Sequence, residues 1–410
     1  MKAMTDRYID DRGAILVHVA VGLLMLTALS AFAIDFGLFW LGRRQAQNSA
    51  DAGALAGAIA LGFDNGSDKS DTGPAKRSAY TAALDNLVGG KVPAVNITTD
   101  ITFPVCPDGT STCIRVDVYR DAAHGNALPM FAGNLVGLGS QGVRATATAQ
   151  AMSGNATECL KPWALLDRWE EFWPVDPGTW TTSSTFDKYK NNGTLDPKIT
   201  TPDVYVPPTA SSPGSGFAPV DSSGNLTADY GLELTLKTGS ANLFNAGSFQ
   251  ALDLVCPGGA CYEAAIKSCV NVTNFIGQTV TLETGNITGK TKQGTYSDPN
   301  SLCKQDPGAS WNPSLNGGHG GVAGSAFDIS PRVVAIPLIS PDALALAKNG
   351  KATGVPIENI MGMFIECPPA VNPPSDTVIG RLMLSPGDKV TGGSNVGPQS
   401  SFLKVFALVR

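Results

Sequence analysis

Hydrophobic residues run almost without interruption from Ala14 to Ile34, where the chain reads AILVHVAVGLLMLTALSAFAI and His18 is the only strongly polar residue. A helix of this length crosses the hydrocarbon core of a bilayer, which is about 30 Å thick. The pattern therefore predicts one membrane span that contacts lipid through residues 14–34. Residues 1–12 precede it as a short polar tail.

A second helical pattern follows the span. Residues 41–61 (LGRRQAQNSADAGALAGAIAL) contain no proline and are rich in alanine, which favours a helix. Ala50, Ala54 and Ala58 recur every fourth residue and so lie on one helix face. We expect one helix over residues 13–62, whose second half packs closely against another element through this small-residue face.

Two forms of processing stay open for the N-terminal segment. Ala31-Phe32-Ala33 has the A-x-A form of a signal-peptidase site, and cleavage there would release a soluble protein. The apolar run is long for a signal sequence, and helix-forming sequence continues beyond Asp35. These two features favour an uncleaved anchor.

Residues 63–152 alternate between helical and strand patterns, which predicts a small α+β region after a polar linker at 62–73. The clearest strand is Ile114 to Arg120, where apolar and polar residues alternate. The full set of expected elements is a helix at Lys76–Val88, a strand at Val95–Phe103, a strand at Ile114–Arg120, a helix at Ala127–Leu138 and a strand at Val143–Met152. A long helix beside a small sheet is a pilin-like arrangement.

Residues 153–410 are rich in proline, glycine, serine and threonine around short apolar stretches, which is typical of a β-rich domain. The fold class expected for the whole chain is therefore α+β. Residues 191–225 have few apolar runs and read as an exposed loop. The expected strands are Gly231–Lys237, Ser330–Ile339, Ile360–Glu366 and Ser401–Val409, with a short helix at Tyr262–Val270. Phe244–Val255 is expected to be a turn followed by a strand that ends at Cys256.

Cysteine usage indicates an oxidising compartment. All eight cysteines follow residue 100, and no C-x-x-C pair suited to a metal is present. They are Cys106, Cys113, Cys159, Cys256, Cys261, Cys269, Cys303 and Cys367. Disulfides are expected, and two of the spacings suit small covalent loops, but the full connectivity stays open. Because the charges that flank the span are mixed, the cysteines decide its orientation, with the N-terminus in the cytoplasm.

Charge argues against nucleic-acid binding. The formal net charge is −6, and no run of lysine or arginine could follow a phosphate backbone. The chain has only three histidines, and neither His124 nor His319 stands in a motif that would make it a catalytic base. We predict no catalytic, cofactor-binding or metal-ligating residues, while a pair of carboxylates that meet in space stays open.

Several short motifs resemble known binding sites but lack the required context. Gly137–Gly142 fits G-x-G-x-x-G yet leads into a strand, so a helix-terminating turn is expected. Gly285–Thr291 is one residue short of a phosphate-binding loop and is expected to be a turn between strands. The DSSGN stretch from Asp221 to Asn225 resembles a D-x-S-x-S metal motif with its last serine replaced. The aspartates at 64, 68 and 71 lack the spacing of a calcium loop.

Four tryptophans gather at Trp163, Trp169, Trp173 and Trp180. Exposed aromatic rings could form a platform for sugar binding, whereas buried rings would build the domain core. The core is the favoured interpretation.

The order of features in the first 60 residues resembles the N-terminal segment of TadE/TadG-like Flp pilus-assembly proteins. The apolar run ends in Asp35-Phe36-Gly37, and Arg43, Arg44 and Gln45 follow it, before the block from Ala50 to Ala58 (ADAGALAGA). Pseudopilins of this family are cut after a glycine that has a glutamate five residues on, but the residue five after Gly13 is His18. The resemblance therefore implies an uncleaved, TadG-like anchor. Parts of 153–410, such as Cys159–Trp163, are similar to the extracytoplasmic region of some Tad-domain proteins, which implies architecture and no activity.

The expected organisation is a cytoplasmic tail at 1–12, a Tad-like transmembrane helix with its extension at 13–62, a small α+β region at 63–152 and a β-rich, disulfide-containing domain at 153–410. The resemblance implies a membrane-anchored structural protein of pilus or secretion-system assembly, with pilus or envelope-complex proteins as partners and self-association left open. A cell-surface adhesin or binding module is the first alternative, and a secreted hydrolase is the second.

Overall fold

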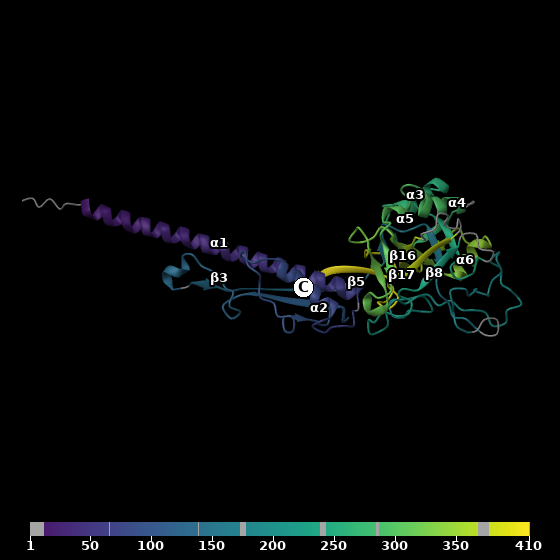
Figure 1. Cartoon of the computed structure of the whole chain (residues 1–410), viewed down its shortest axis with the longest axis horizontal. Helices are drawn as coiled ribbons and strands as arrows, with labels where there is room; N and C mark the ends of the chain where they lie inside the picture. The colour runs from purple at the N-terminus through teal and green to yellow at the C-terminus, as the bar shows by residue number, and fades with distance from the viewer. Residues whose placement is uncertain are drawn as a thin grey trace, which may run out of the picture. The chain divides into compact units, whose positions relative to one another are not determined.

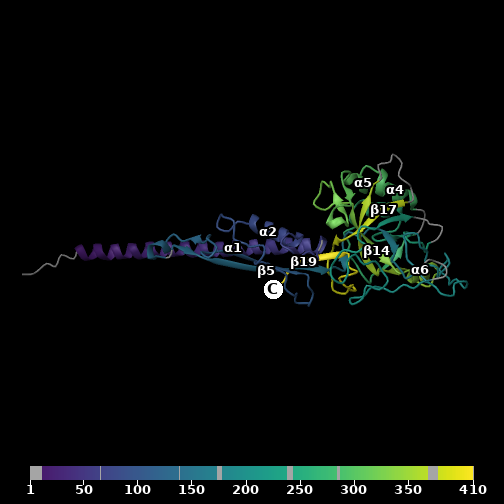
Figure 2. The same ribbon diagram turned by 60° about the horizontal axis from the view of Figure 1, so that its bottom comes forward.

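The computed structural model describes residues 12–64, 66–137, 139–172, 178–237, 243–283, 287–367 and 377–409. The chain divides into two compact units. Unit 1 contains Met1–Ala58, Ser70–Gln150 and Leu408–Arg410, and unit 2 contains Ile59–Lys69 and Ala151–Ala407. Figure 1 shows the whole chain, and Figure 2 gives a second view of the same elements. Each unit is described by itself.

Unit 1 is built on one long helix, α1 (Arg12–Phe63), whose last residues enter unit 2. Its other elements are α2 (Pro74–Asp85), β1 (Ile101–Thr102), β2 (Cys113–Arg120), β3 (Leu128–Pro129), the 3-10 helix η1 (Gly133–Val136), β4 (Ser140–Gln141) and β5 (Val143–Ser153). Strand β2 pairs antiparallel with both β1 and β5. In both figures β5 and α2 lie beside the C-terminal half of α1.

Unit 2 is organised around an eight-stranded sheet with the order β15-β11-β9-β7-β14-β16-β17-β8. These strands are β7 (Trp163–Leu166), β8 (Glu233–Lys237), β9 (Phe249–Asp253), β11 (Thr279–Leu282), β14 (Val333–Ile339), β15 (Val355–Pro356), β16 (Asn359–Glu366) and β17 (Thr377–Met383). The neighbours β7 and β14 are parallel, and the other pairs whose register is described here are antiparallel.

Short elements complete unit 2. They are β6 (Ala156–Thr157), α3 (Gly259–Lys267), β10 (Asn274–Phe275), α4 (Thr288–Lys292), the π-helix η2 (Gln293–Ser297), α5 (Leu302–Gln305), β12 (Ser310–Asn312), the 3-10 helix η3 (Asn316–Gly318), β13 (Gly321–Ala323), α6 (Pro341–Lys348), β18 (Ser385–Pro386) and β19 (Leu403–Val409). The sheet carries a hydrophobic core on each face, because alternate residues of a strand point to opposite sides. In β14, for example, Ile336 and Leu338 enter one core while Ala335 and Ile339 enter the other.

The structure confirms the α+β fold class, with a long apolar helix followed by a β-rich region. It also confirms the long helix and the strands expected at Ile114–Arg120, Val143–Met152, Ser330–Ile339 and Ile360–Glu366 within a few residues.

The helix expected at Ala127–Leu138 is wrong. This segment instead forms β3, a turn and the single 3-10 turn η1, and Leu138 lies outside the described residues. The backbone N–H groups of Phe131, Ala132 and Gly133 bond the Asp35 carboxylate and do not continue a helix. Gly137, with φ of 83°, then ends η1 in the left-handed conformation, as the expected helix-terminating turn requires.

Three other expectations need correction. The strand expected at Val95–Phe103 is only the two residues of β1. Gly285–Thr291 is not a turn between strands, because α4 begins at Thr288, while residues 284–286 lie outside the described part. The linker expected at 62–73 begins later, because Gly62 and Phe63 still belong to α1.

Candidate functional site

The N-terminal half of α1 exposes a continuous apolar surface. Its large side chains are uncovered in the folded chain, and Leu24, at the centre of residues 14–34, is 72% exposed. Among the described residues, α1 is the one helix long and apolar enough to cross a membrane. Exposure of so large an apolar surface to water is unfavourable, so this half of the helix needs a lipid or protein environment.

Asp35 ends the apolar run, and its carboxylate holds a distant loop. It accepts hydrogen bonds from the backbone N–H groups of Phe131 (2.6 Å), Ala132 (2.7 Å) and Gly133 (2.8 Å). These donors lead into η1, and Asp35 is only 6% exposed. Three charge-assisted bonds satisfy a buried carboxylate that would otherwise be costly at this position.

The C-terminal half of α1 forms a close-packed interface within unit 1. Ala50, Ala54 and Ala58 are fully buried, so the small-residue face predicted from the sequence is confirmed. Gly53 and Gly57 lie on the same contact. A Cβ atom at Gly53 would be 2.9 Å from the carbonyl oxygen of Ala79 in α2, and one at Gly57 would be 2.6 Å from Cδ1 of Ile114 in β2. Only small residues allow α1 to approach α2 and β2 this closely.

Polar side chains of the same helix half fix its register. The Gln45 side chain accepts a hydrogen bond from the backbone N–H of Gly89 (2.7 Å), and the Ser49 hydroxyl donates to the carbonyl of Ala83 (2.7 Å). Both bonds tie α1 to the segment that contains α2. The rest of unit 1 therefore packs against one surface of α1, which contains Asp35, Gln45 and the small residues from Ala50 to Ala58.

An aromatic stripe continues the apolar surface past Asp35. Phe32, Phe36 and Trp40 follow one another at four-residue intervals, with centroid separations of 6.2 and 6.1 Å. The Arg43 guanidinium lies 6.0 Å from the Trp40 ring. Aromatic and arginine side chains in this order are typical of the boundary between hydrocarbon and lipid headgroups.

The tryptophan cluster belongs to the core, as the sequence interpretation favoured. Trp163 and Trp169 are buried on opposite faces of the sheet of unit 2, and Trp180 packs partly buried against both cores. Trp173 lies outside the described residues. The three described rings do not form an exposed platform for sugar.

The structure reveals one buried carboxylate that the sequence analysis missed. Asp167 directly follows β7 and accepts hydrogen bonds from the backbone N–H groups of Arg168 and Phe217 and from the Tyr205 hydroxyl. Burial raises the pKa of Asp167 to about 6, although these bonds oppose the shift. Both carboxylate oxygens have partners, so Asp167 attaches the 205–217 loop to the sheet. No local motif marks it, because its partners lie far along the chain.

The sequence motifs that resembled binding sites have structural roles or exposed positions. The carboxylate of Asp221 accepts hydrogen bonds from the backbone N–H groups of Ser223 and Asn225, which closes a turn. His124 stacks on Tyr119 and bonds Asp121 at 2.6 Å, and His319 is exposed. Within the described ranges, no three His, Cys, Asp or Glu side chains come together in a way that could hold a metal ion.

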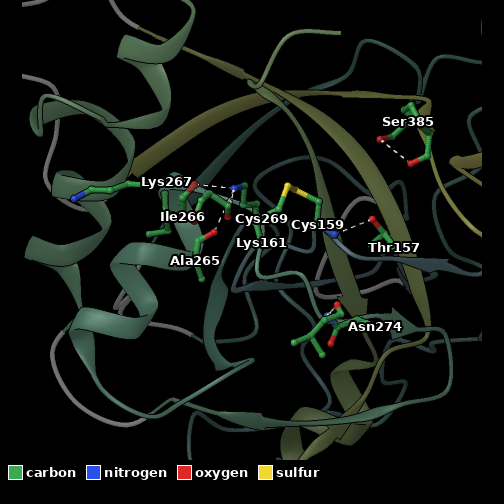
Figure 3. The surroundings of a disulfide bond; sticks show 12 residues. Thr157, Cys159, Lys161, Ala265, Ile266, Lys267, Cys269, Asn274 and Ser385 are labelled. Carbon is green, nitrogen blue, oxygen red and sulfur yellow. Dashed lines mark hydrogen bonds between the residues drawn. A yellow bond between two sulfur atoms is a disulfide. The ribbon is translucent and has the colours of Figure 1, made fainter.

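All eight cysteines pair in disulfides, as the even count predicted. The pairs are Cys106–Cys113, Cys159–Cys269, Cys256–Cys261 and Cys303–Cys367. Beside the Cys159–Cys269 bond, the Lys161 amine donates to the carbonyls of Ala265 (3.2 Å), Ile266 (2.8 Å) and Ser268 (3.0 Å), as Figure 3 shows for the first two. Lys161 thereby caps the C-terminus of α3, where a positive charge is favourable.

Comparison with known proteins agrees with the organisation of α1. Residues 13–60 match the family model for TadE/G-like Flp pilus-assembly proteins, known as Tad. No curated protein and no solved structure matches the chain. The match covers the exposed apolar half, Asp35 and the small-residue face. The chain thus carries a TadE/G-like segment at residues 13–60.

Proposed function

We propose that this chain is a membrane-anchored structural protein of Flp/Tad-type pilus or secretion-system assembly. In this proposal residues 1–12 form a cytoplasmic tail and residues 13–62 form the anchor helix with its extension. Residues 63–152 and 153–410 lie outside the cytoplasm, where they contact pilus or envelope-complex proteins. The role is mechanical, and the chain acts without catalysis.

The observation that carries the proposal is the division of α1 into two dissimilar halves. The first half exposes apolar side chains such as Leu24 and Leu29, while the second half buries Ala50, Ala54 and Ala58 within unit 1. One rigid helix therefore joins a lipid-compatible surface directly to a folded unit. The Tad match covers both halves.

The disulfides support the proposed orientation. Four disulfide bonds favour an oxidising compartment for residues 106–367, since thiols in the cytoplasm are kept reduced. With a single span, the N-terminal tail then lies in the cytoplasm. Gly13 is followed five residues on by His18, so we expect the anchor to stay uncut.

The adhesin and hydrolase alternatives have less support. Trp163 and Trp169, which an aromatic sugar platform would need, are buried. The buried carboxylate of Asp167 has hydrogen-bond donors on both oxygens and is part of the sheet core.

Labelling of single cysteines in intact cells tests the topology, because the native cysteines are all paired. A membrane-impermeant maleimide should label Arg77→Cys, an exposed position in α2, in intact cells and Lys2→Cys only after the membrane is opened. Labelling of both sites, or of neither, before permeabilisation contradicts the proposed topology. Deletion of the chain should also abolish pilus or secretion-complex assembly, and unchanged assembly contradicts the proposed role.

A further inference from the structure

The loop that Asp35 holds exposes a large apolar side chain. Phe131 is 76% exposed although its own backbone N–H is fixed by the Asp35 carboxylate. The nearby Leu128 is buried instead, and its Cδ1 lies 2.5 Å from where a Cβ atom of Gly42 would be. The loop therefore packs one apolar residue against α1 and leaves another uncovered.

The height of this loop along α1 is set by Asp35. With a rise of 1.5 Å per residue, Asp35 lies about 16 Å from Leu24, the centre of residues 14–34. Half the thickness of the hydrocarbon core is about 15 Å. Since three backbone N–H groups of residues 131–133 contact the Asp35 carboxylate within 2.8 Å, the loop lies at the outer edge of the hydrocarbon.

The surface of α1 at the same height is already suited to lipid. Phe32, Phe36 and Trp40 are exposed there, and Arg43 follows them. Phe131, on the loop that bonds Asp35, adds exposed apolar surface at this height. Aromatic side chains favour this interfacial zone.

We propose that residues 129–133 are a second membrane contact, in which Phe131 inserts into the outer leaflet while Asp35 holds the loop against the anchor helix. The inference rests on the proposed anchoring of α1 and adds a lipid-binding surface that the helix alone does not supply. Unit 1 is then attached to the bilayer at two points, which restricts the rotation and tilt of the unit about α1. The ligand is a lipid bilayer surface.

Spin labels on single introduced cysteines test this proposal in the full chain, reconstituted in vesicles of phosphatidylethanolamine and phosphatidylglycerol. Oxygen concentrates in the bilayer and a nickel chelate stays in water, so the two collision rates report the environment of each label. The test position is Phe131→Cys. Leu24→Cys is the reference for lipid, and Arg77→Cys, at an exposed position of α2, is the reference for water in the same unit.

We expect the label at residue 131 to lose most nickel-chelate collisions and to resemble the label at residue 24. If it resembles the label at residue 77 while residue 24 reports lipid, the loop contact is overturned and the anchor stands. If residue 24 also reports water, the anchoring itself fails.

A second variant tests the role of Asp35. Asp35→Asn replaces a carboxylate oxygen with an NH₂ group that cannot accept from the loop. The label at residue 131 should become more mobile and gain nickel-chelate collisions, with residue 24 unchanged. Asp51→Asn is the matched control, because Asp51 lies in the same helix but bonds Gln47, four residues away. Equal behaviour of the two variants overturns the assignment to Asp35.

Discussion

Gly53 allows a sharp test of the close contact between α1 and the rest of unit 1. A Cβ atom there would lie 2.9 Å from the carbonyl oxygen of Ala79, 3.0 Å from Cβ of Ala83 and 3.3 Å from Cγ1 of Val116. Gly53→Leu therefore forces α1 away from α2 and β2. Overpacking of this kind costs about 3 kcal/mol. The better helix propensity of leucine returns about 1 kcal/mol.

The expected net loss is about 2 kcal/mol in the free energy of opening unit 1, or roughly 30-fold in the equilibrium constant. Hydrogen exchange measured by mass spectrometry should show that increase for the amides of β2. The amides of β14 and β16, in unit 2, serve as an internal reference. Gly37→Leu is the matched control, because no atom lies within 4 Å of a Cβ at that position. Unchanged protection of β2 in Gly53→Leu would refute the packing argument.

Three further predictions concern unit 2. Since the folded pKa of Asp167 is raised to about 6 from 3.8, its contribution to stability grows as pH falls. Relative to Asp167→Asn, the wild type should gain about 1.4 kcal/mol in the free energy of unfolding between pH 7.5 and pH 5, measured by urea titration. Parallel pH profiles of the two proteins would contradict this. Lys161→Met leaves three carbonyls at the end of α3 without their donor and should lower the free energy of unfolding by about 2 kcal/mol in the same titration. Lys190→Met, at an exposed position, is the control and should leave the free energy of unfolding unchanged. Replacing Cys159 and Cys269 with alanine frees a loop with a sequence separation of 110 and should lower the free energy of unfolding by about 4 kcal/mol. Replacing Cys256 and Cys261, which have a separation of 5, should cost less. Equal losses would contradict the loop-entropy argument.

Elements with strong periodic patterns were predictable from the sequence. The apolar run, the small-residue face at Ala50, Ala54 and Ala58 and the alternating strand at Ile114–Arg120 each depend on spacing within one element. Local spacing fixes which side chains share a face, so it predicts which face is buried.

Contacts between distant segments were not predictable. Asp35 marks the end of the apolar run in the sequence, but its partners lie 96 to 98 residues away. Asp167 reads as an ordinary charged residue, and its partners are brought to it only by the fold of the 205–217 loop. The error at Ala127–Leu138 has the same origin, because those backbone N–H groups bond a carboxylate in α1 and do not continue a helix.

The most direct test of the central claim is the state of the N-terminal segment in the cell. Membranes should be washed with alkaline carbonate, which removes peripheral proteins, and the retained chain identified by intact mass and N-terminal sequencing. We predict that the washed membranes retain a chain in which residues 1–34 are uncut. A soluble product that begins at Ile34 would contradict the anchor, and a membrane product that begins at Ala14 would show a processed pseudopilin instead.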